Sequence, residues 1–333
     1  RRRHTRFRNV TGVQTCALPI FDVLQYGSGT GTAGTREAVA RTMAAEGIHV
    51  DPAHVQVTAG SQMALDLVVK LLCDPGDVVL AEGPTYVGAL GLFAGMQVDV
   101  VHVPMDADGI VPTGLEETLA RVRAEGRRVK ALYTIPNFNN PSGVTLAAER
   151  RPEVVRICRA AGIAVIEDNP YGLLSFDGSS TPSLHALDPD NVIYLGSFSK
   201  VVAPGLRVGW AVAPEAVRRP LQLASEATTI CPSVLSQALV EQYVLHHDWP
   251  SVLDRARKLY ATRAAAVLGA LAHSAPDGVT WSVPRGGFFT WVSLPEGIDV
   301  HRVLDAAIER RVVFVPGSAF HADGGGTRQL RLA

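Results

Sequence analysis

Short apolar runs rich in β-branched residues alternate with segments of helical spacing over the first two thirds of the chain. The apolar runs have the length of strands and lie at residues 55–59, 77–82, 129–135, 162–168 and 191–197. Helical spacing of apolar residues marks residues 36–47, 61–72, 86–95 and 147–162. Continuous apolar strands separated by helices predict an α/β fold, in which a mostly parallel central sheet is covered by helices on both faces.

The pattern changes after Pro232. A long helical region covers residues 234–272, and the sequence VTWSVPRGGFFTWVSL predicts a hairpin around Arg285–Gly287. One further helix and a strand at VVFVPG, residues 312–317, follow the hairpin. We therefore expect a large α/β domain at residues 21–232 and a smaller, incomplete α+β domain at residues 233–333.

Both ends of the chain have unusual sequences. Residues 1–20 are rich in arginine and lack acidic residues, and VTGVQTCALPI resembles the conceptual translation of a sequencing adapter. We expect residues 1–20 to be a non-native artefact, with the native sequence beginning near Phe21. The other end, TRQLRLA, stops within an apolar strand pattern, so we expect the chain to be an internal fragment, truncated at both ends.

Composition narrows the classes of function. The 333 residues are 47% hydrophobic with a formal net charge of −1, which allows a large core and argues against a strongly basic nucleic-acid-binding surface. We find no apolar run of the roughly 18–20 residues that a membrane span needs. The four cysteines are widely spaced and form no zinc pattern, so we expect reduced thiols, no metal site and a cytoplasmic enzyme.

A glycine-rich stretch raises a first hypothesis about function. GTGTAG at residues 29–34 matches the GxGxxG pattern, and Asp51 follows at the distance typical of a dinucleotide-binding fingerprint. The preceding FDVLQY contains Asp22 and Gln25, unlike a strand buried on both faces. A glycine turn before a helix explains the stretch equally well, and a dinucleotide site remains the minor alternative.

Polar residues follow several predicted strands and raise a second hypothesis. GSFSK at residues 196–200 places Lys200 after an apolar strand, where a lysine could simply extend its ammonium to water. Similar strand ends carry GSQ at 60–62, NFNNPSG at 137–143 and DNPY at 168–171. Each has an ordinary structural explanation, but the carboxyl ends of parallel strands meet at one edge of a sheet. An anion cradle, a carboxylate, an amide and a lysine together suit a cofactor such as pyridoxal phosphate.

The motifs, in their order along the chain, resemble the class I/II aminotransferases of fold type I, and most closely the 2-aminoadipate and kynurenine group. The resemblance runs from Leu24 to Ala333 and rests on LQYG, TAGSQMALDL, DPGDVVLAEGPTY, YTIPNFNNPSG, IEDNPYG, GSFSKVVAPGLRVGW, PRGGFF and VPGSAF. It implies a pyridoxal-phosphate enzyme that moves the amino group of an L-amino acid to a 2-oxo acid such as 2-oxoglutarate. It also implies a homodimer with shared active sites, with no nucleic-acid or membrane partner.

The resemblance assigns catalytic roles to three residues. Lys200 matches the Schiff-base lysine, whose neutral amine attacks the cofactor aldehyde and then moves the proton between Cα and C4′. We expect burial and the nearby Arg207 to favour that neutral amine. Asp168 matches the carboxylate that keeps the ring nitrogen protonated, and Tyr86 matches the aromatic residue that stacks on the ring.

The resemblance also assigns binding roles. Asn140 and Tyr171 match the hydrogen-bond partners of the ring oxygen, and Asn140 together with Arg331 matches the site of the substrate carboxylate. Tyr26 matches a tyrosine that reaches the phosphate of the neighbouring subunit, although Thr32 stands where the family has an aromatic residue. The residues that match phosphate ligands are Ser61, Gln62, Ser197, Ser199 and Arg207.

Two other functions are compatible with the same residues. The chain could be the aminotransferase-like sensor domain of a winged-helix transcriptional regulator. It could also be a lyase or decarboxylase that uses pyridoxal phosphate on the same fold. The first alternative predicts a DNA-binding segment before Phe21, and the second is separated from transamination by the reaction product.

Overall fold

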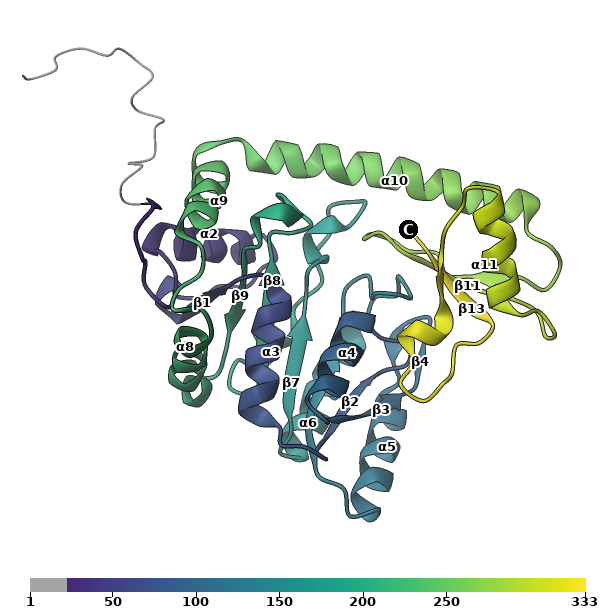
Figure 1. The fold of residues 1–333 in the computed structure, drawn as a ribbon, viewed down its shortest axis with the longest axis horizontal. Helices are drawn as coiled ribbons and strands as arrows, with labels where there is room; N and C mark the ends of the chain where they lie inside the picture. Colours follow the sequence, from purple (N-terminus) through teal and green to yellow (C-terminus); the bar gives the residue numbers. More distant parts are fainter. Residues whose placement is uncertain (1–22) are drawn as a thin grey trace, which may run out of the picture.

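A seven-stranded sheet forms the centre of the larger part of the molecule in the computed structural model, which describes residues 23–333 (Figure 1). The expected artefact at residues 1–20 lies outside the described residues. Five neighbouring strands run parallel, and β9 runs antiparallel to both of its neighbours. In spatial order the strands are β1 (Val55–Thr58), β9 (Gly209–Val212), β8 (Val192–Ser197), β7 (Ala164–Asp168), β6 (Val129–Thr134), β2 (Val78–Glu82) and β3 (Asp99–Val103).

Helices cover both faces of this sheet, as the apolar strands predict. One face packs with α3 (Ser61–Leu72), α4 (Val87–Gly95) and α8 (Glu215–Thr229). The other face packs with α5 (Pro112–Ala124), α6 (Arg151–Ala160) and the short α7 (Leu184–Leu187). Helices α2 (Ala33–Ala44) and α9 (Val234–His246) pack against each other at the β1 end of the sheet. Strands β1, β2, β8 and β9 are buried along their whole length, which explains why their sequences do not alternate between apolar and polar residues.

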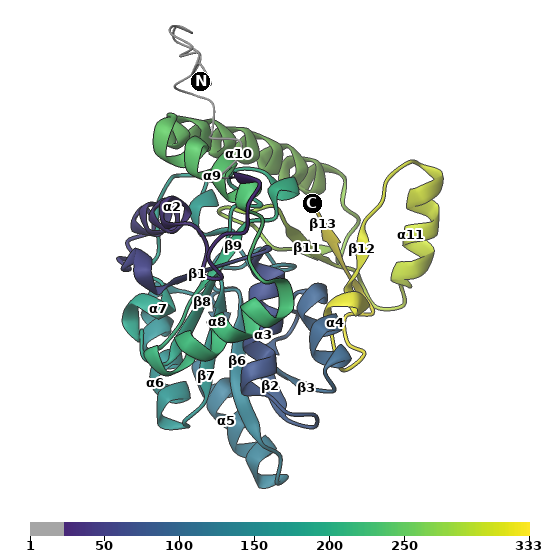
Figure 2. The same cartoon turned by 60° about the vertical axis from the view of Figure 1, so that its left-hand side comes forward.

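The smaller part is an antiparallel sheet beside helix α11 (Val300–Glu309) (Figure 2). Its core contains Val292, Val300, Phe314 and Leu330. The predicted hairpin is confirmed, since β10 pairs with β11. In spatial order the strands are β10 (Thr280–Trp281), β11 (Thr290–Ser293), β13 (Gln329–Leu332) and β12 (Val315–Pro316).

The helical region after Pro232 differs from the prediction, because it forms two helices. Helix α9 ends at His246, and the 26-residue α10 (Trp249–Ser274) extends from the larger part to the smaller part (Figure 1). Asp248 caps α10 by accepting a hydrogen bond from the Ser251 amide, and Pro250 occupies the first turn, where no amide donor is needed. Helix α9 and the start of α10 contribute Val240 and Leu253 to the larger core, and a domain boundary at residue 232 stays a prediction.

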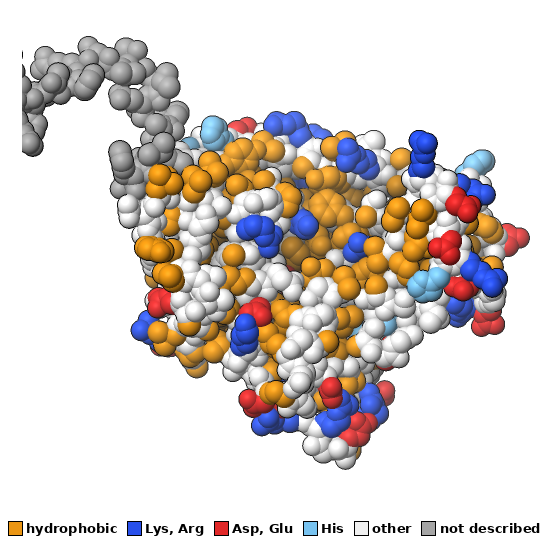
Figure 3. Space-filling view, viewed as in Figure 1, with side chains coloured by type: hydrophobic (Ala, Val, Ile, Leu, Met, Phe, Trp, Pro, Cys, Tyr) orange, Lys and Arg blue, Asp and Glu red, His pale blue; other side chains and the backbone are white. Residues whose placement is uncertain are grey.

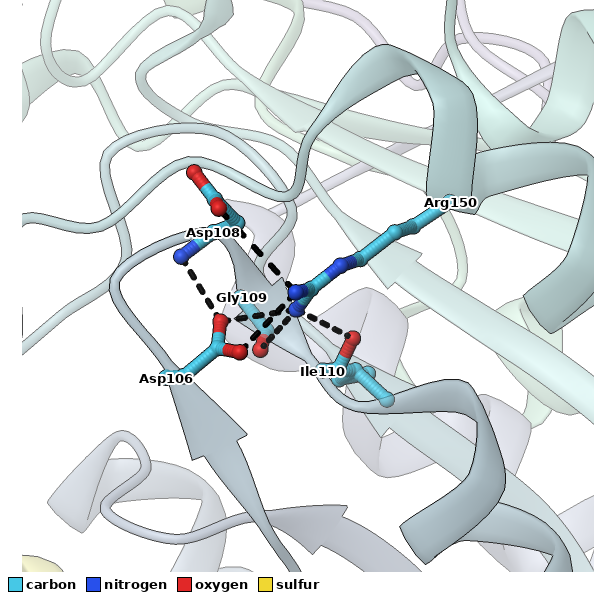
Figure 4. A network of polar contacts seen from close by, with 5 residues as sticks. All are labelled: Asp106, Asp108, Gly109, Ile110 and Arg150. Atoms are coloured by element: carbon cyan, nitrogen blue, oxygen red, sulfur yellow. Dashed lines mark hydrogen bonds and ion pairs between the residues drawn. The ribbon is translucent and has the colours of Figure 1, made fainter.

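An ion-pair network joins Arg150, which directly precedes α6, to a small hairpin (Figure 4). The guanidinium of Arg150 pairs with Asp106, at 2.7 Å and 2.9 Å, and donates to the carbonyls of Gly109 and Ile110. These contacts hold the small hairpin of β4 (Met105–Asp106) and β5 (Gly109–Ile110), and they hold the pKa of Asp106 below its usual value. Within residues 23–333, none of the helices has the length and apolar character needed to cross a bilayer.

Candidate functional site

A cavity of about 300 Å³ lies at the carboxyl ends of the central strands and reaches the smaller sheet. Every site residue predicted from the sequence lines this cavity, except Tyr26. The lining consists of Ser61, Gln62, Tyr86, Ile135, Asn140, Asp168, Pro170, Tyr171, Ser197, Ser199, Lys200, Pro204, Arg207, Phe289 and Arg331. Residues far apart in the sequence therefore meet at one edge of the sheet, as the parallel strand order requires.

One wall of the cavity is an anion cradle at the N-terminus of α3. Gly60 caps this helix with φ of 89°, and a Cβ at this position would overlap the guanidinium of Arg207. Arg207 donates to the Ala59 carbonyl at 3.2 Å and to Ser199 Oγ at 3.4 Å, and Ser199 Oγ lies 2.8 Å from Ser197 Oγ. Free helix amides, hydroxyls and a guanidinium thus face the same space, which suits a phosphate group.

Asp168 ends strand β7 with its carboxylate buried in the floor of the cavity. Its Oδ2 accepts a hydrogen bond from the hydroxyl of Tyr133 at 2.8 Å, whereas its Oδ1 is buried without a partner. Burial raises the pKa of Asp168 to about 6. A buried acceptor without a donor is costly, so Oδ1 is suited to a ligand that brings an N–H group. The role of Tyr133 was missed in the sequence, where its hydrophobic neighbours indicate only a strand residue.

Arg331 lies on β13 and faces the same cavity from the smaller sheet. Its Nη1 donates to Asn140 Oδ1 at 2.7 Å, and its Nε is buried without a partner. The guanidinium carbon lies 4.4 Å from the ring centre of Phe289 and 5.0 Å from that of Phe320. These two aromatic residues belong to the PRGGFF and VPGSAF motifs, and only the fold brings them into contact with Arg331. Asn140 and the two rings fix the position of the guanidinium, and its remaining N–H groups can donate to a carboxylate.

Two tyrosines complete the walls. Tyr171 is buried, and burial raises the pKa of its hydroxyl above the ordinary value. Tyr86 precedes α4, and burial together with the negative charge of Asp168 raises the pKa of its hydroxyl. Both hydroxyls are therefore neutral at neutral pH and able to donate a hydrogen bond.

Lys200 differs from expectation in its surroundings. Lys200 lines the cavity from the turn after β8, but it is an exposed residue of the single chain, not the buried residue that we expected. Strand β8 ends at Ser197, and Lys200 lies in the turn that follows, where the described residues leave it exposed to solvent. Tyr26 is 80% exposed and lies outside the cavity.

The dinucleotide alternative is wrong. Residues 23–28 contain no strand before the glycine-rich stretch. Thr32 caps α2 through the Thr35 amide, and its own amide donates to Gln237 Oε1 at 2.8 Å. Asp51 caps the short 3₁₀ helix Pro52–His54 by accepting from the Ala53 amide. The stretch is a glycine turn before a helix.

A buried carboxyl group at the end of β2 anchors the turn that carries Asn140. Glu82 accepts from the Thr134 hydroxyl at 2.9 Å, the Ile135 amide at 2.9 Å and Asn139 Nδ2 at 2.8 Å. Burial raises the pKa of Glu82 to about 7. No local sequence signal indicates this role, because Glu82 and Asn139 belong to different strand ends.

Glu46 holds the side chain of Asn169, the residue that follows Asp168. Its carboxyl accepts from Asn169 Nδ2 at 2.6 Å and from the hydroxyl of Tyr194 at 3.3 Å. Burial is the main cause that raises the pKa of Glu46 to about 8, with a smaller effect of the same sign from Glu167 and an opposing one from Arg151.

This pKa gives a prediction about stability. A carboxyl group with a raised pKa in the folded state stabilises fully below its unfolded pKa, and the contribution is lost as pH rises through the folded pKa of about 8. We expect the free energy of unfolding to fall between about pH 5 and pH 8, and Glu46→Gln to flatten this slope by up to about 1.4 kcal/mol per pH unit. Urea denaturation over that range measures the slope. The exposed Glu37→Gln is the control, and an unchanged slope in Glu46→Gln would contradict the prediction.

Comparison with known proteins agrees with this geometry. Residues 19–333 match the profile of the family described as "Aminotransferase class I and II". A 2-aminoadipate transaminase from Thermus thermophilus is 40% identical over 298 residues, which cover 88% of this chain and 73% of the relative. The crystal structure of Pyrococcus horikoshii kynurenine aminotransferase in complex with PMP superimposes with a TM-score of 0.89 at 37% identity, covering 94% of this chain and 78% of that one.

A relative of another functional class also matches. The uncharacterized HTH-type transcriptional regulator YisV of Bacillus subtilis is 33% identical over 311 residues. The match covers 93% of this chain but 63% of the regulator. The regulator therefore contains additional sequence beyond the matched region.

Proposed function

The chain belongs to the class I and II aminotransferases, and we propose that its cavity transfers the amino group of an L-amino acid to a 2-oxo acid with pyridoxal phosphate as cofactor. The observation that carries this proposal is the convergence of Lys200, the unpartnered Asp168 Oδ1 and the Arg207 cradle on one cavity. A lone lysine near a strand end needs no function, but these three groups are complementary to different parts of one cofactor.

The residues present fit this cofactor. Pyridoxal phosphate, when bound, supplies an electron sink for the negative charge that develops at the substrate Cα. The α3 N-terminus with Ser61, Gln62, Ser197, Ser199 and Arg207 would hold the phosphate. Asp168 Oδ1, which lacks a partner, would hold a proton on the ring nitrogen.

The remaining residues bind, orient and move protons. Lys200 would hold the cofactor covalently and, once released, take the proton from the substrate Cα as general base. Tyr171 and Asn140 would hydrogen-bond the ring oxygen, and Tyr86 would pack against the ring face. Tyr133 orients Asp168 through its 2.8 Å hydrogen bond.

Arg331 is the residue that we assign to the substrate carboxylate, with Asn140 beside it. The two names among the relatives, 2-aminoadipate and kynurenine, support a donor with a long side chain, either acidic or aromatic. We propose 2-oxoglutarate as the acceptor, since its α-carboxylate would meet the same guanidinium.

Arg331→Lys tests this assignment. An ammonium cannot reproduce the two parallel hydrogen bonds of a guanidinium, so we expect kcat/KM for the amino donor to fall by about 10- to 100-fold. Steady-state kinetics with 2-aminoadipate and kynurenine measure the loss, and the cofactor should still bind. Arg328→Lys, on the same segment but exposed, is the control. Equal kinetics in Arg331→Lys and wild type would remove Arg331 from the substrate site.

We propose that the enzyme is a homodimer, in which Tyr26 reaches the phosphate cradle of the second subunit. Helices α8 and α9 lie on one side of the molecule, and that side of Figure 3 shows many hydrophobic side chains. Exposed apolar residues there include Leu223, Ile230, Leu235 and Leu239, and a second copy would remove them from water. Sedimentation equilibrium should give the mass of two chains, and the mass of one chain would contradict this proposal.

A regulator remains the second candidate, because of the match to the HTH-type regulator. A sensor domain would bind the cofactor through Lys200 without turning over an amino donor. A lyase would release a product other than the 2-oxo acid. Product analysis therefore separates the regulator and the lyase from the aminotransferase. A cytoplasmic location and the absence of a nucleic-acid partner stay predictions for the aminotransferase.

A further inference from the structure

A second group of potential ligand residues lies outside the active site, where the edge of the large sheet contacts the smaller part. His102 is on the edge strand β3, and His321 and Asp323 follow the 3₁₀ helix Gly317–Phe320. One ligand atom from each of the three residues lies within 4.8 Å of the other two. The imidazole rings of His102 and His321 have their centres 5.4 Å apart.

The hydrogen bonds of His102 define which nitrogen is available. Its Nδ1 lies 2.8 Å from the Glu82 carbonyl oxygen, which can only accept, so Nδ1 carries the proton. Its Nε2 therefore presents a lone pair, which accepts the Ala322 amide at 2.9 Å. The contact to the Glu82 carbonyl is the kind of second contact that orients metal-bound histidines.

The other two ligand residues lie in the loop after the 3₁₀ helix. His321 Nδ1 lies 3.7 Å from Asp323 Oδ1, and His321 Nε2 is buried without a hydrogen-bond partner. The Gly325 amide donates to Asp323 Oδ1 at 2.9 Å, and a Cβ on Gly325 would lie 2.9 Å from His321 Nδ1 and 3.0 Å from that oxygen, so glycine leaves room beside the two ligand atoms. Asp323 and Ala322 are exposed, which gives an ion access and lets water satisfy the Ala322 amide if it leaves His102.

We propose that His102, His321 and Asp323 form a site for a divalent transition-metal ion of the zinc type, with water completing the coordination. Two imidazole nitrogens and one carboxylate oxygen are ligands that Zn²⁺ prefers, and three protein ligands leave a position for water. The cysteine spacing predicts no metal site, in contrast to this proposal. The three ligands proposed here come from segments far apart in the sequence, so no local motif indicates them.

A bound ion would join two segments that support the active site. The Thr85 amide already donates to the Phe320 carbonyl at 3.0 Å, and Phe320 packs against the guanidinium of Arg331. The metal would replace the hydrogen bond from the Ala322 amide to His102 with metal coordination between the sheet edge and residues 321–323. It would thereby stabilise the folded state without touching the cofactor or the substrate.

The test is equilibrium dialysis of the chelator-treated, cofactor-loaded chain against Zn²⁺, with the metal counted by atomic emission. We expect one Zn²⁺ per chain and a higher melting temperature with Zn²⁺. We expect His321→Asn and Asp323→Asn to weaken binding at least about tenfold, whereas the exposed His273→Asn should bind as wild type does. Asp323 is exposed, so its variant should fold even where a histidine variant does not.

Absence of stoichiometric Zn²⁺ binding, or equal binding by Asp323→Asn and wild type, would overturn the proposal. Neither readout depends on amino-group transfer. The proposal therefore fails or succeeds independently of the function proposed for the active site.

Discussion

Lys200→Ala should abolish amino-group transfer, with a fall in kcat of about 10⁴-fold or more, because one substitution removes both a nucleophile and a general base. Lys200 is the lysine among the residues that line the cavity, and no neighbouring lining residue offers an amine. The melting temperature should change little, since the side chain is exposed in the single chain. Single-turnover mixing of the cofactor-loaded chain with an amino donor measures the rate.

The matched control is Lys258→Ala, which removes an exposed lysine from α10. This variant should keep the rate of the wild type. A Lys200→Ala variant that folds, binds the cofactor and transfers the amino group at a rate within tenfold of wild type would contradict the assigned role.

Asp168→Asn should have the second largest effect, a fall in kcat of about 10²- to 10³-fold. Two unit charges 4 Å apart interact by about 4 kcal/mol at an effective dielectric constant of 20, before desolvation is subtracted. An asparagine cannot supply the charge that holds a proton on the ring nitrogen. Stopped-flow measurement of the half-reaction with the amino donor gives the effect.

The fold should survive this substitution. Burial raises the pKa of Asp168 to about 6, so above that pH the folded chain keeps a carboxylate that is costly to bury. Asp168→Asn removes this cost, and we expect an equal or higher melting temperature at about pH 8. Asp305→Asn, an exposed position on α11, is the control. A catalytic loss that merely parallels a loss of melting temperature would show a structural role only.

The sequence pattern predicts much of the larger part correctly. Helix α3 begins and ends where its apolar spacing predicts, because Gly60 and the following polar residue define its start. The strands that end at Asp168 and Ser197 are also correct within two residues at their starts. Fully buried parallel strands and their helices are strong local signals. The family resemblance and fold are confirmed by the comparisons.

Other features depend on contacts that the linear pattern does not contain. The apolar pattern does not predict β9 as a strand, and the reversed direction of β9 follows only from its pairing with β1 and β8. The Tyr133 contact to Asp168 joins two neighbouring strands, and the Glu46 contact to Asn169 joins the end of α2 to the site. The sequence predicts a buried Lys200, but this residue is exposed in the turn after β8. Whether such a turn is buried depends on neighbouring segments, which the local sequence does not show.

The most direct test of the central claim is the visible absorption spectrum of the chain loaded with pyridoxal phosphate, before and after addition of 2-aminoadipate, kynurenine or glutamate. We predict a visible band that requires Lys200 and that one of these amino acids converts to the spectrum of pyridoxamine phosphate. A band of the same intensity in Lys200→Ala would contradict the role of this lysine. A Lys200-dependent band that none of the amino acids changes would contradict the aminotransferase and favour the sensor domain.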